Sequence, residues 1–193
     1  MKLKFIACFI LGFVTSAAHA QVDFPLERGP IVAHHLQIVS SEFVVDVYQN
    51  GKLVPAKQHT LEKEIYGAQI ERVDLEIREG DWLVFHVVNN DLRGDNFPRY
   101  FVVAGMVDDK RSAFVSETQS GNWFVCDNVQ NVPQFITDRD YHGDGPAHRL
   151  TVHWSDGDKE ISQRVPGWSG DPIWGTSHEP WIKYIVAAPK DQS

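Results

Sequence analysis

The sequence predicts an all-β protein: an antiparallel β-sandwich or jelly roll with long loops and at most one or two short helices. Short segments rich in β-branched and aromatic residues recur along the chain. Gly, Asn and Asp turns separate these segments, and apolar residues rarely recur with helical spacing. Strands spaced this closely are typical of sandwiches and jelly rolls.

The first predicted hairpin joins residues 43–48 to a return strand that starts at residues 52–54. Asn50-Gly51 between them is a strong turn signal, because both positions accept positive φ. Residues 73–77 alternate apolar and acidic, as in a strand with one wet face. Residues 82–88 are almost continuously apolar, which indicates a central strand covered on both faces.

Five further strands are predicted, at residues 100–104, 113–115, 123–125, 150–154 and 181–186. Helix signals are few. Asn131 precedes a predicted short helix that runs through Ile136, and residues 61–66 are consistent with a helical turn or two. Residues 143–175 are mostly turn residues and tryptophans, which predicts long loops at one end of the sandwich.

Residues 1–20 have the features of a secretory signal peptide. Lys2 and Lys4 precede an apolar run, and residues 18–20 form a small-x-small cleavage site. The run is too short to span a membrane. We expect cleavage after Ala20, which leaves residues 21–193 as a single β-sandwich domain, periplasmic or secreted, with no membrane span.

Charge and cysteine content narrow the function classes. The formal net charge is −8, and loss of Lys2 and Lys4 makes it −10. A negative surface argues against nucleic acid as a partner, since binding to phosphates needs Lys and Arg; it permits cations and neutral ligands such as sugars. Cys126 is the one cysteine after residue 20, so no intrachain disulfide is expected and the thiol is predicted to be buried and inert.

Two segments resemble the galactose-binding-like jelly-roll superfamily. Residues 43–52 contain the pattern Tyr-x-Asn-Gly-Lys, and residues 78–90 place a Gly-Asp turn before a buried strand that ends in Asn. Members include sugar-binding modules and free-standing lectins. The resemblance implies that residues 82–88 cross the middle of a sheet and that the loop after them carries ligand or calcium sites at the sandwich end.

Candidate ligand contacts are loop aromatics and the polar side chains of that loop. Trp168 and Trp174 lie among turn formers in residues 166–175, and Trp123 is the third candidate. An indole there either stacks on a sugar ring or packs down as a plug over the sandwich end, and the sequence leaves both readings open. The expected polar contacts are Asn90, Arg93 and Arg99.

A structural calcium ion is the one cofactor that the sequence leaves open. The same loop supplies carboxylate and amide oxygens, the ligands that Ca²⁺ prefers, from Asp91, Asp95 and Asn96. Asp156-Gly157-Asp158 is also oxygen-rich, but it is expected to be a simple turn. Histidine and cysteine spacings match no zinc motif. After Cys126 the first histidine is His142 and no methionine follows, which argues against a blue-copper site.

Enzyme activity is not predicted, because the sequence has no Gly-x-Ser-x-Gly elbow and no spacing that ties Ser, His and Asp together. The leading hypothesis is an exported, non-enzymatic module that binds carbohydrate or another cell-envelope component. One alternative is a structural or protein-interaction module whose tryptophans are all packed. The other is a hydrolase with an unrecognised site.

Overall fold

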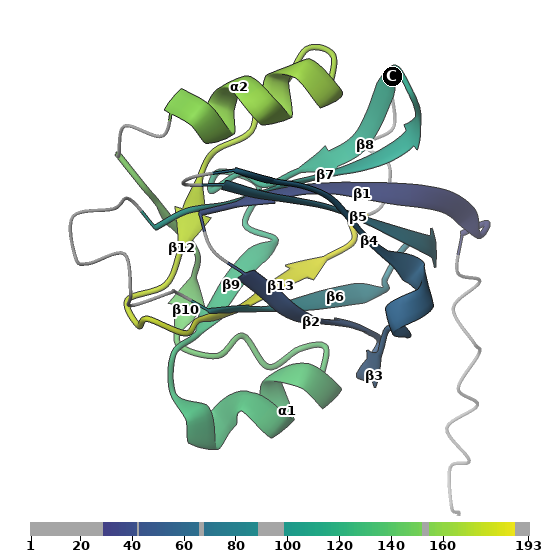
Figure 1. The fold of residues 1–193 in the computed structure, drawn as a ribbon. Helices are drawn as coiled ribbons and strands as arrows, with labels where there is room; N and C mark the ends of the chain where they lie inside the picture. Colours follow the sequence, from purple (N-terminus) through teal and green to yellow (C-terminus); the bar gives the residue numbers. More distant parts are fainter. Residues whose placement is uncertain (1–28, 42, 66–67, 89–98, 152–154, 188–193) are drawn as a thin grey trace, which may run out of the picture.

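The structure, a computed structural model, describes residues 29–41, 43–65, 68–88, 99–151 and 155–187. Two antiparallel sheets pack face to face, and a short helix covers the outer face of each (Figure 1). The predicted all-β sandwich is therefore confirmed. Within these ranges, no helix has the length and apolar composition needed to cross a membrane.

Sheet A, the upper layer in Figure 1, has seven strands. In spatial order they are β11 (His148–Arg149), β12 (Ile173–Trp174), β7 (Phe101–Asp108), β1 (Val32–Ser40), β5 (Ala68–Ile77) and β4 (His59–Ile65), with β8 (Arg111–Val115) also paired to β7. Strand β4 therefore forms one lateral edge of the sheet.

Sheet B has six strands, in the order β10 (Gly145–Pro146), β9 (Trp123–Cys126), β13 (Trp181–Ile185), β6 (Trp82–Val88), β2 (Phe43–Gln49) and β3 (Lys52–Leu53). The helices are α1 (Val132–Thr137), α2 (Ser155–Arg164) and the 3₁₀ turns η1 (Ala56–Gln58) and η3 (Val129–Asn131). Through η1 the chain passes from the β2–β3 edge of sheet B to the β4 edge of sheet A (Figure 1).

The space between the sheets holds the main core. Leu36 and Ile38 of β1 point into it, and so does Val73, which pairs with Leu36 across β1 and β5. Val39 and Ile70 point the other way and pack in the cluster beneath α2. This alternation follows from the two-residue period of a strand.

A buried lysine fastens the segment after α1 to the outer face of sheet B. Lys183 is fully buried, and its Nζ donates to the carbonyls of Asp138 and Tyr141 at 2.8 and 2.7 Å. The same Nζ lies 4.2 Å from the centre of the Phe135 ring. Burial lowers the pKa of Lys183 to about 8, but the carbonyls and the ring occupy its surroundings, so the amine has a structural role.

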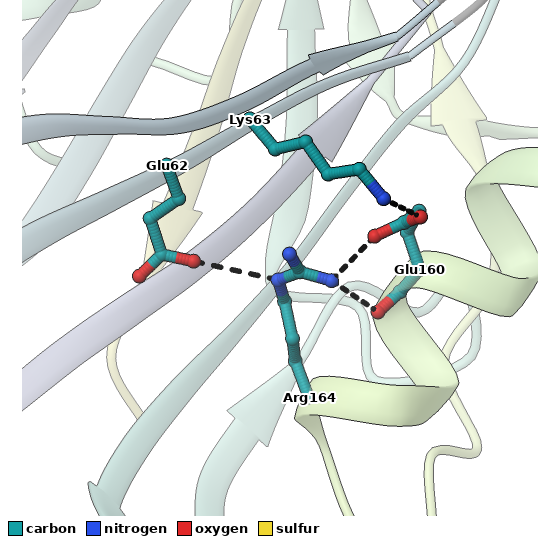
Figure 2. A network of polar contacts seen from close by, with 4 residues as sticks. All are labelled: Glu62, Lys63, Glu160 and Arg164. Carbon is teal, nitrogen blue, oxygen red and sulfur yellow. Dashed lines mark hydrogen bonds and ion pairs between the residues drawn. The ribbon is translucent and has the colours of Figure 1, made fainter.

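A β-bulge between Leu61 and Lys63 sets which side chains of β4 reach α2. Figure 2 shows two consecutive residues, Glu62 and Lys63, both extending to the helix. Lys63 Nζ lies 2.5 Å from Glu160 Oε1, and Glu62 Oε2 lies 3.4 Å from Arg164 Nε. The bulge thus leaves Leu61 on the inner face.

Helix α2 corrects the prediction of long loops over residues 143–175 and of a turn at Asp156-Gly157-Asp158. Ile161 and Val165, four residues apart, are buried against sheet A. A Cβ on the glycine of the predicted turn would lie 2.4 Å from the Tyr100 hydroxyl oxygen. That glycine allows the helix to approach the sheet closely, and it does not mark a turn.

Three other predictions are also settled. The helical turns over residues 61–66 are wrong, since β4 contains residues 61–65, and the strand expected to end at Gly105 continues to Asp108. The helix expected after Asn131 is confirmed as α1, although the Asn131 side chain makes no capping hydrogen bond.

Two turns at the same end of sheet B are tied together by one buried carboxylate. Asp81 is 2% exposed. It accepts hydrogen bonds from Asn50 Nδ2 at 2.9 Å, Gln49 Nε2 at 3.2 Å and the Arg78 backbone N–H at 3.1 Å. The Asn50-Gly51 hairpin, with φ of 53° and 77° at its two residues, is therefore fastened to the turn before β6.

Candidate functional site

Two of the three tryptophans expected to contact a ligand are part of the core. Trp123 and Trp174 are each 2% exposed. The Trp123 ring stacks on Tyr184 with 4.5 Å between centroids, and the Trp174 indole N–H donates to the Ser177 carbonyl at 3.0 Å. Burial leaves neither ring a face for stacking on a sugar, so of the two alternatives that the sequence left open, both rings take the packed one.

Trp168 is half-buried and packs on the cluster beneath α2. Its ring end lies so close to Gly170 that a Cβ there would be 2.3 Å from Trp168 Cη2. Arg99, the polar candidate that the structure describes, places Nη2 3.1 Å from His178 Nδ1. The other candidates of that loop lie outside the described residues: Asn90, Arg93 and the expected calcium ligands Asp91, Asp95 and Asn96.

Metal and thiol chemistry find little support in the part of the chain that the structure describes. There, no three His, Cys, Asp or Glu side chains lie close enough together to hold a metal ion. Cys126 is fully buried, and burial is the main cause that raises its pKa to about 11. The thiol is therefore protonated at neutral pH and unreactive.

An inter-sheet cavity of about 780 Å³ lies at one end of the sandwich. It lies where β1 and β8 begin and where β5, β7 and β13 end. Its floor is made of the buried side chains of His34, Ile77, Phe114 and Tyr184. Val32, Glu79, Arg111 and Ala113 are exposed and form its rim.

Strand alternation and one glycine create the floor. Val32 and His34 point inward from β1, and His35 points to the opposite face, as expected for adjacent histidines on a strand. Phe114 pairs with Gly105, and a Cβ there would lie 2.2 Å from the Phe114 ring. The missing side chain lets the ring lie across β7, where it stacks on Tyr184 at 4.4 Å.

The polar groups of the floor are uncharged at neutral pH. Burial is the main cause that lowers the pKa of His34, and burial raises the pKa of Tyr184 above its ordinary value. His34 Nδ1 lies 2.8 Å from the Val32 carbonyl. Because a carbonyl only accepts, Nδ1 carries the proton and Nε2 is left as an acceptor. The floor thus combines two aromatic rings with one neutral acceptor and one phenol, and charged side chains of both signs line the rest of the cavity.

Sequence reasoning did not select the floor residues His34, Phe114 and Tyr184. A strand over residues 32–40 was not predicted, because its inward positions mix His, Leu, Ile and Ser and give a weak alternation signal. Phe114 and Tyr184 do fall in predicted strands, at residues 113–115 and 181–186. Their strands were predicted, but nothing in a strand pattern shows that two rings from different sheets meet.

A second recess, the lateral cleft, opens between the β2–β3 edge of sheet B and the β4 edge of sheet A. Its volume is about 310 Å³, and its lining includes Val45, Asp46, Leu53, His59, Leu61 and Glu71. Glu71 is 6% exposed and faces inward from β5 opposite Leu61. Its carboxylate Oε1 lies 2.5 Å from Gln69 Nε2, and burial raises the pKa of Glu71 to about 7.

Replacing Glu71 by glutamine is expected to stabilise the protein above pH 7. The carboxyl has a pKa of about 7 when folded against an ordinary value of 4.5. The folded state therefore binds more protons between these values, and the wild type loses stability as pH rises through this window. In urea unfolding, the free energy of unfolding of Glu71→Gln should exceed that of the wild type. The difference should grow from near zero at pH 4.5 to about 2–3 kcal/mol at pH 8.

Glu76→Gln is the matched control for this experiment. Glu76 lies on the same strand and is exposed, so its substitution is expected to change the free energy of unfolding by at most about 0.5 kcal/mol at either pH. An advantage of Glu71→Gln that does not vary with pH would contradict the protonated, buried carboxyl.

The fold and its recesses define the class of molecule: an antiparallel β-sandwich with a ligand-sized cavity between its sheets. No family model, curated protein or solved structure matches the chain. The resemblance to the galactose-binding-like superfamily stays a prediction, and function has to be argued from the cavity itself.

Proposed function

We propose that this protein is a non-enzymatic binding protein that holds a small, uncharged and largely apolar molecule in the inter-sheet cavity. The observation that carries the proposal is the aromatic floor, in which Phe114 and Tyr184 from opposite sheets stack at 4.4 Å beneath a cavity of about 780 Å³. Sites for small molecules are concave, mostly apolar and of this size, with a few polar groups that orient the ligand.

The polar groups of the cavity specify the ligand further. His34 Nε2 is an acceptor, which favours a ligand with one hydroxyl or N–H donor. Both His34 and Tyr184 are uncharged at neutral pH, so the floor offers no partner for a charged group, whose desolvation would then go uncompensated. The charged residues that line the rest of the cavity balance in sign: Arg78, Arg111, Glu79 and Glu117. Arg111 Nη2 also lies 3.5 Å from Asp108 Oδ2. We infer a neutral amphiphile with a ring or alkyl body.

A neutral amphiphile agrees with the envelope ligand that the sequence suggests. It would bind to the side chains of the cavity, and not to the loop residues that the sequence analysis selected. A sugar ring would turn its hydroxyls toward Ile77 and Phe114, which offer no hydrogen bonds, so carbohydrate is the weaker match. Export, expected from residues 1–20, would place the protein where envelope amphiphiles occur. The structural or protein-interaction module of the sequence analysis is the alternative if the cavity stays empty.

The proposal is tested with N-phenyl-1-naphthylamine, a neutral aromatic probe with one N–H donor whose fluorescence rises in apolar surroundings. We expect saturable binding to the wild type. Val32→Trp should weaken it by about tenfold or more, equivalent to about 1.4 kcal/mol, because Val32 lines the cavity mouth and is 39% exposed. The exposed position lets the larger ring enter the mouth without disturbing the core.

Ala33→Trp is the control. Ala33 is the next residue of β1, is also exposed, and pairs with Glu76 on the opposite face. This variant adds the same indole outside the cavity and should bind the probe like the wild type. A wild type that does not bind saturably, or equal affinities of the two variants, would overturn the proposal and favour the interaction module.

A further inference from the structure

Glu71 differs from the other buried acids that the structure describes. Asp81 Oδ1 lies 3.8 Å from Arg78 Nε. The Glu160 carboxylate oxygens lie 2.5 Å from Lys63 Nζ and 2.6 Å from Arg164 Nη1. Glu71 is as deeply buried, and its one polar contact among the described residues is the Gln69 amide. A buried carboxylate without a cation is costly, and this one lines a cleft that is open to solvent.

The walls of the lateral cleft are apolar and unusually exposed. Val45, Leu53 and Leu61 are 52%, 56% and 56% exposed and line the cleft from β2, β3 and β4. Asp46 adds a second carboxylate at the cleft. Burial is the main cause that lowers the pKa of His59, so the histidine is neutral at pH 7 and supplies no competing cation. The cleft therefore combines exposed apolar side chains with two carboxyl groups, those of Glu71 and Asp46.

We propose that the lateral cleft is a second binding site, which takes a small organic cation: a primary amine with a short apolar chain. The ammonium pairs with the Glu71 carboxylate, and the chain covers the exposed side chains of Leu53 and Leu61. A volume of about 310 Å³ suits a molecule of this size and is small for a drug-sized ligand. The acidic net charge of the protein, −8, favours the approach of a cation.

A proton takes the place of the cation when the cleft is empty. Gln69 Oε1 is buried and has no hydrogen-bond partner among the described residues, although Nε2 of the same amide contacts Glu71. Turning the amide over would let a protonated Glu71 donate to that oxygen. An ammonium ion binds only to the ionised Glu71 carboxyl, so its binding displaces this proton. The affinity for the ammonium ion therefore rises with pH.

The probe for this site is n-hexylammonium, which keeps its charge between pH 6 and pH 8. In an NMR titration we expect saturable shifts of β2 and β4 amides around the cleft, with an affinity about tenfold higher at pH 8 than at pH 6, from a pKa of about 7. Glu71→Gln should weaken binding about tenfold at pH 8 and remove the pH dependence. Hexan-1-ol, of the same length and uncharged, should bind weakly at both pH values.

Two variants keep the test specific. Glu76→Gln removes an exposed carboxylate from the same strand and should bind like the wild type, which separates a local ion pair from a change in net charge. Val32→Trp narrows the other cavity and should also leave hexylammonium binding unchanged. Equal affinities of the wild type and Glu71→Gln at pH 8, or shifts confined to residues around the inter-sheet cavity, would overturn the proposal.

Discussion

Replacing Trp174 by alanine is expected to lower the free energy of unfolding by about 3–5 kcal/mol. The indole is 2% exposed and belongs to the core between the sheets. The variant loses the transfer free energy of a large ring and leaves a cavity that neighbouring strands can fill only in part. It also leaves the Ser177 carbonyl without the indole N–H that it accepts at 3.0 Å. Denaturant unfolding monitored by far-UV circular dichroism measures the loss.

Trp168→Ala is the matched control, because Trp168 lies in the same loop region but is half-buried. The free energy of unfolding should fall by a smaller amount, about 1 kcal/mol, because the substitution changes the core little. Similar losses for the two variants would mean that Trp174 is not sealed in the interior. A Trp174→Ala variant of wild-type stability would favour the other alternative of the sequence analysis, an indole that is free to stack on a ligand.

Replacing Asp81 by alanine is expected to cost about 3 kcal/mol of stability. The buried carboxylate accepts hydrogen bonds from Gln49, Asn50 and the Arg78 backbone at 2.9–3.2 Å. Without it these donors lose their acceptor, and the hairpin at Asn50 loses its tie to the turn before β6. Hydrogen exchange should then accelerate at the β2–β3 turn as well as at the turn before Trp82.

The surface pair of Arg72 and Asp74, with atoms 2.9 Å apart and both side chains well exposed, supplies the comparison. Asp74→Ala should change stability by less than about 1 kcal/mol and leave exchange at the hairpin unaltered. If Asp81→Ala costs no more than Asp74→Ala, the two turns are not held by this carboxylate.

The parts of the fold that could be predicted are those in which the local pattern and the final environment agree. Residues 73–77 alternate and form half of β5, and the apolar run at residues 82–88 is the centrally placed β6. Helix α2 escaped prediction because its buried Ile161, and Val165 directly after its end, stand among Asp, Gly and Ser, which favour turns. Packing against sheet A overrides those local preferences.

The candidate site could be predicted less well, for a physical reason. A loop with Trp168 and Trp174 has the same composition whether its rings face outward or pack inward, and the choice depends on the space beneath the loop. Glu71 lies outside the predicted strand over residues 73–77, and an alternating strand normally places its acids on the wet face. Its inward direction follows from the two-residue period that it shares with Val73. Its burial beside a cleft at the β4 edge is visible only in the three-dimensional structure.

The most direct test of the central claim is a measurement of intermolecular nuclear Overhauser effects between bound N-phenyl-1-naphthylamine and the protein. The account predicts contacts from the probe to the ring protons of Phe114 and Tyr184 and to the methyl groups of Ile77, because these side chains form the cavity floor. Contacts confined to Trp168 and its loop, with none to the two stacked rings, would contradict it and return the binding surface to the end of the sandwich.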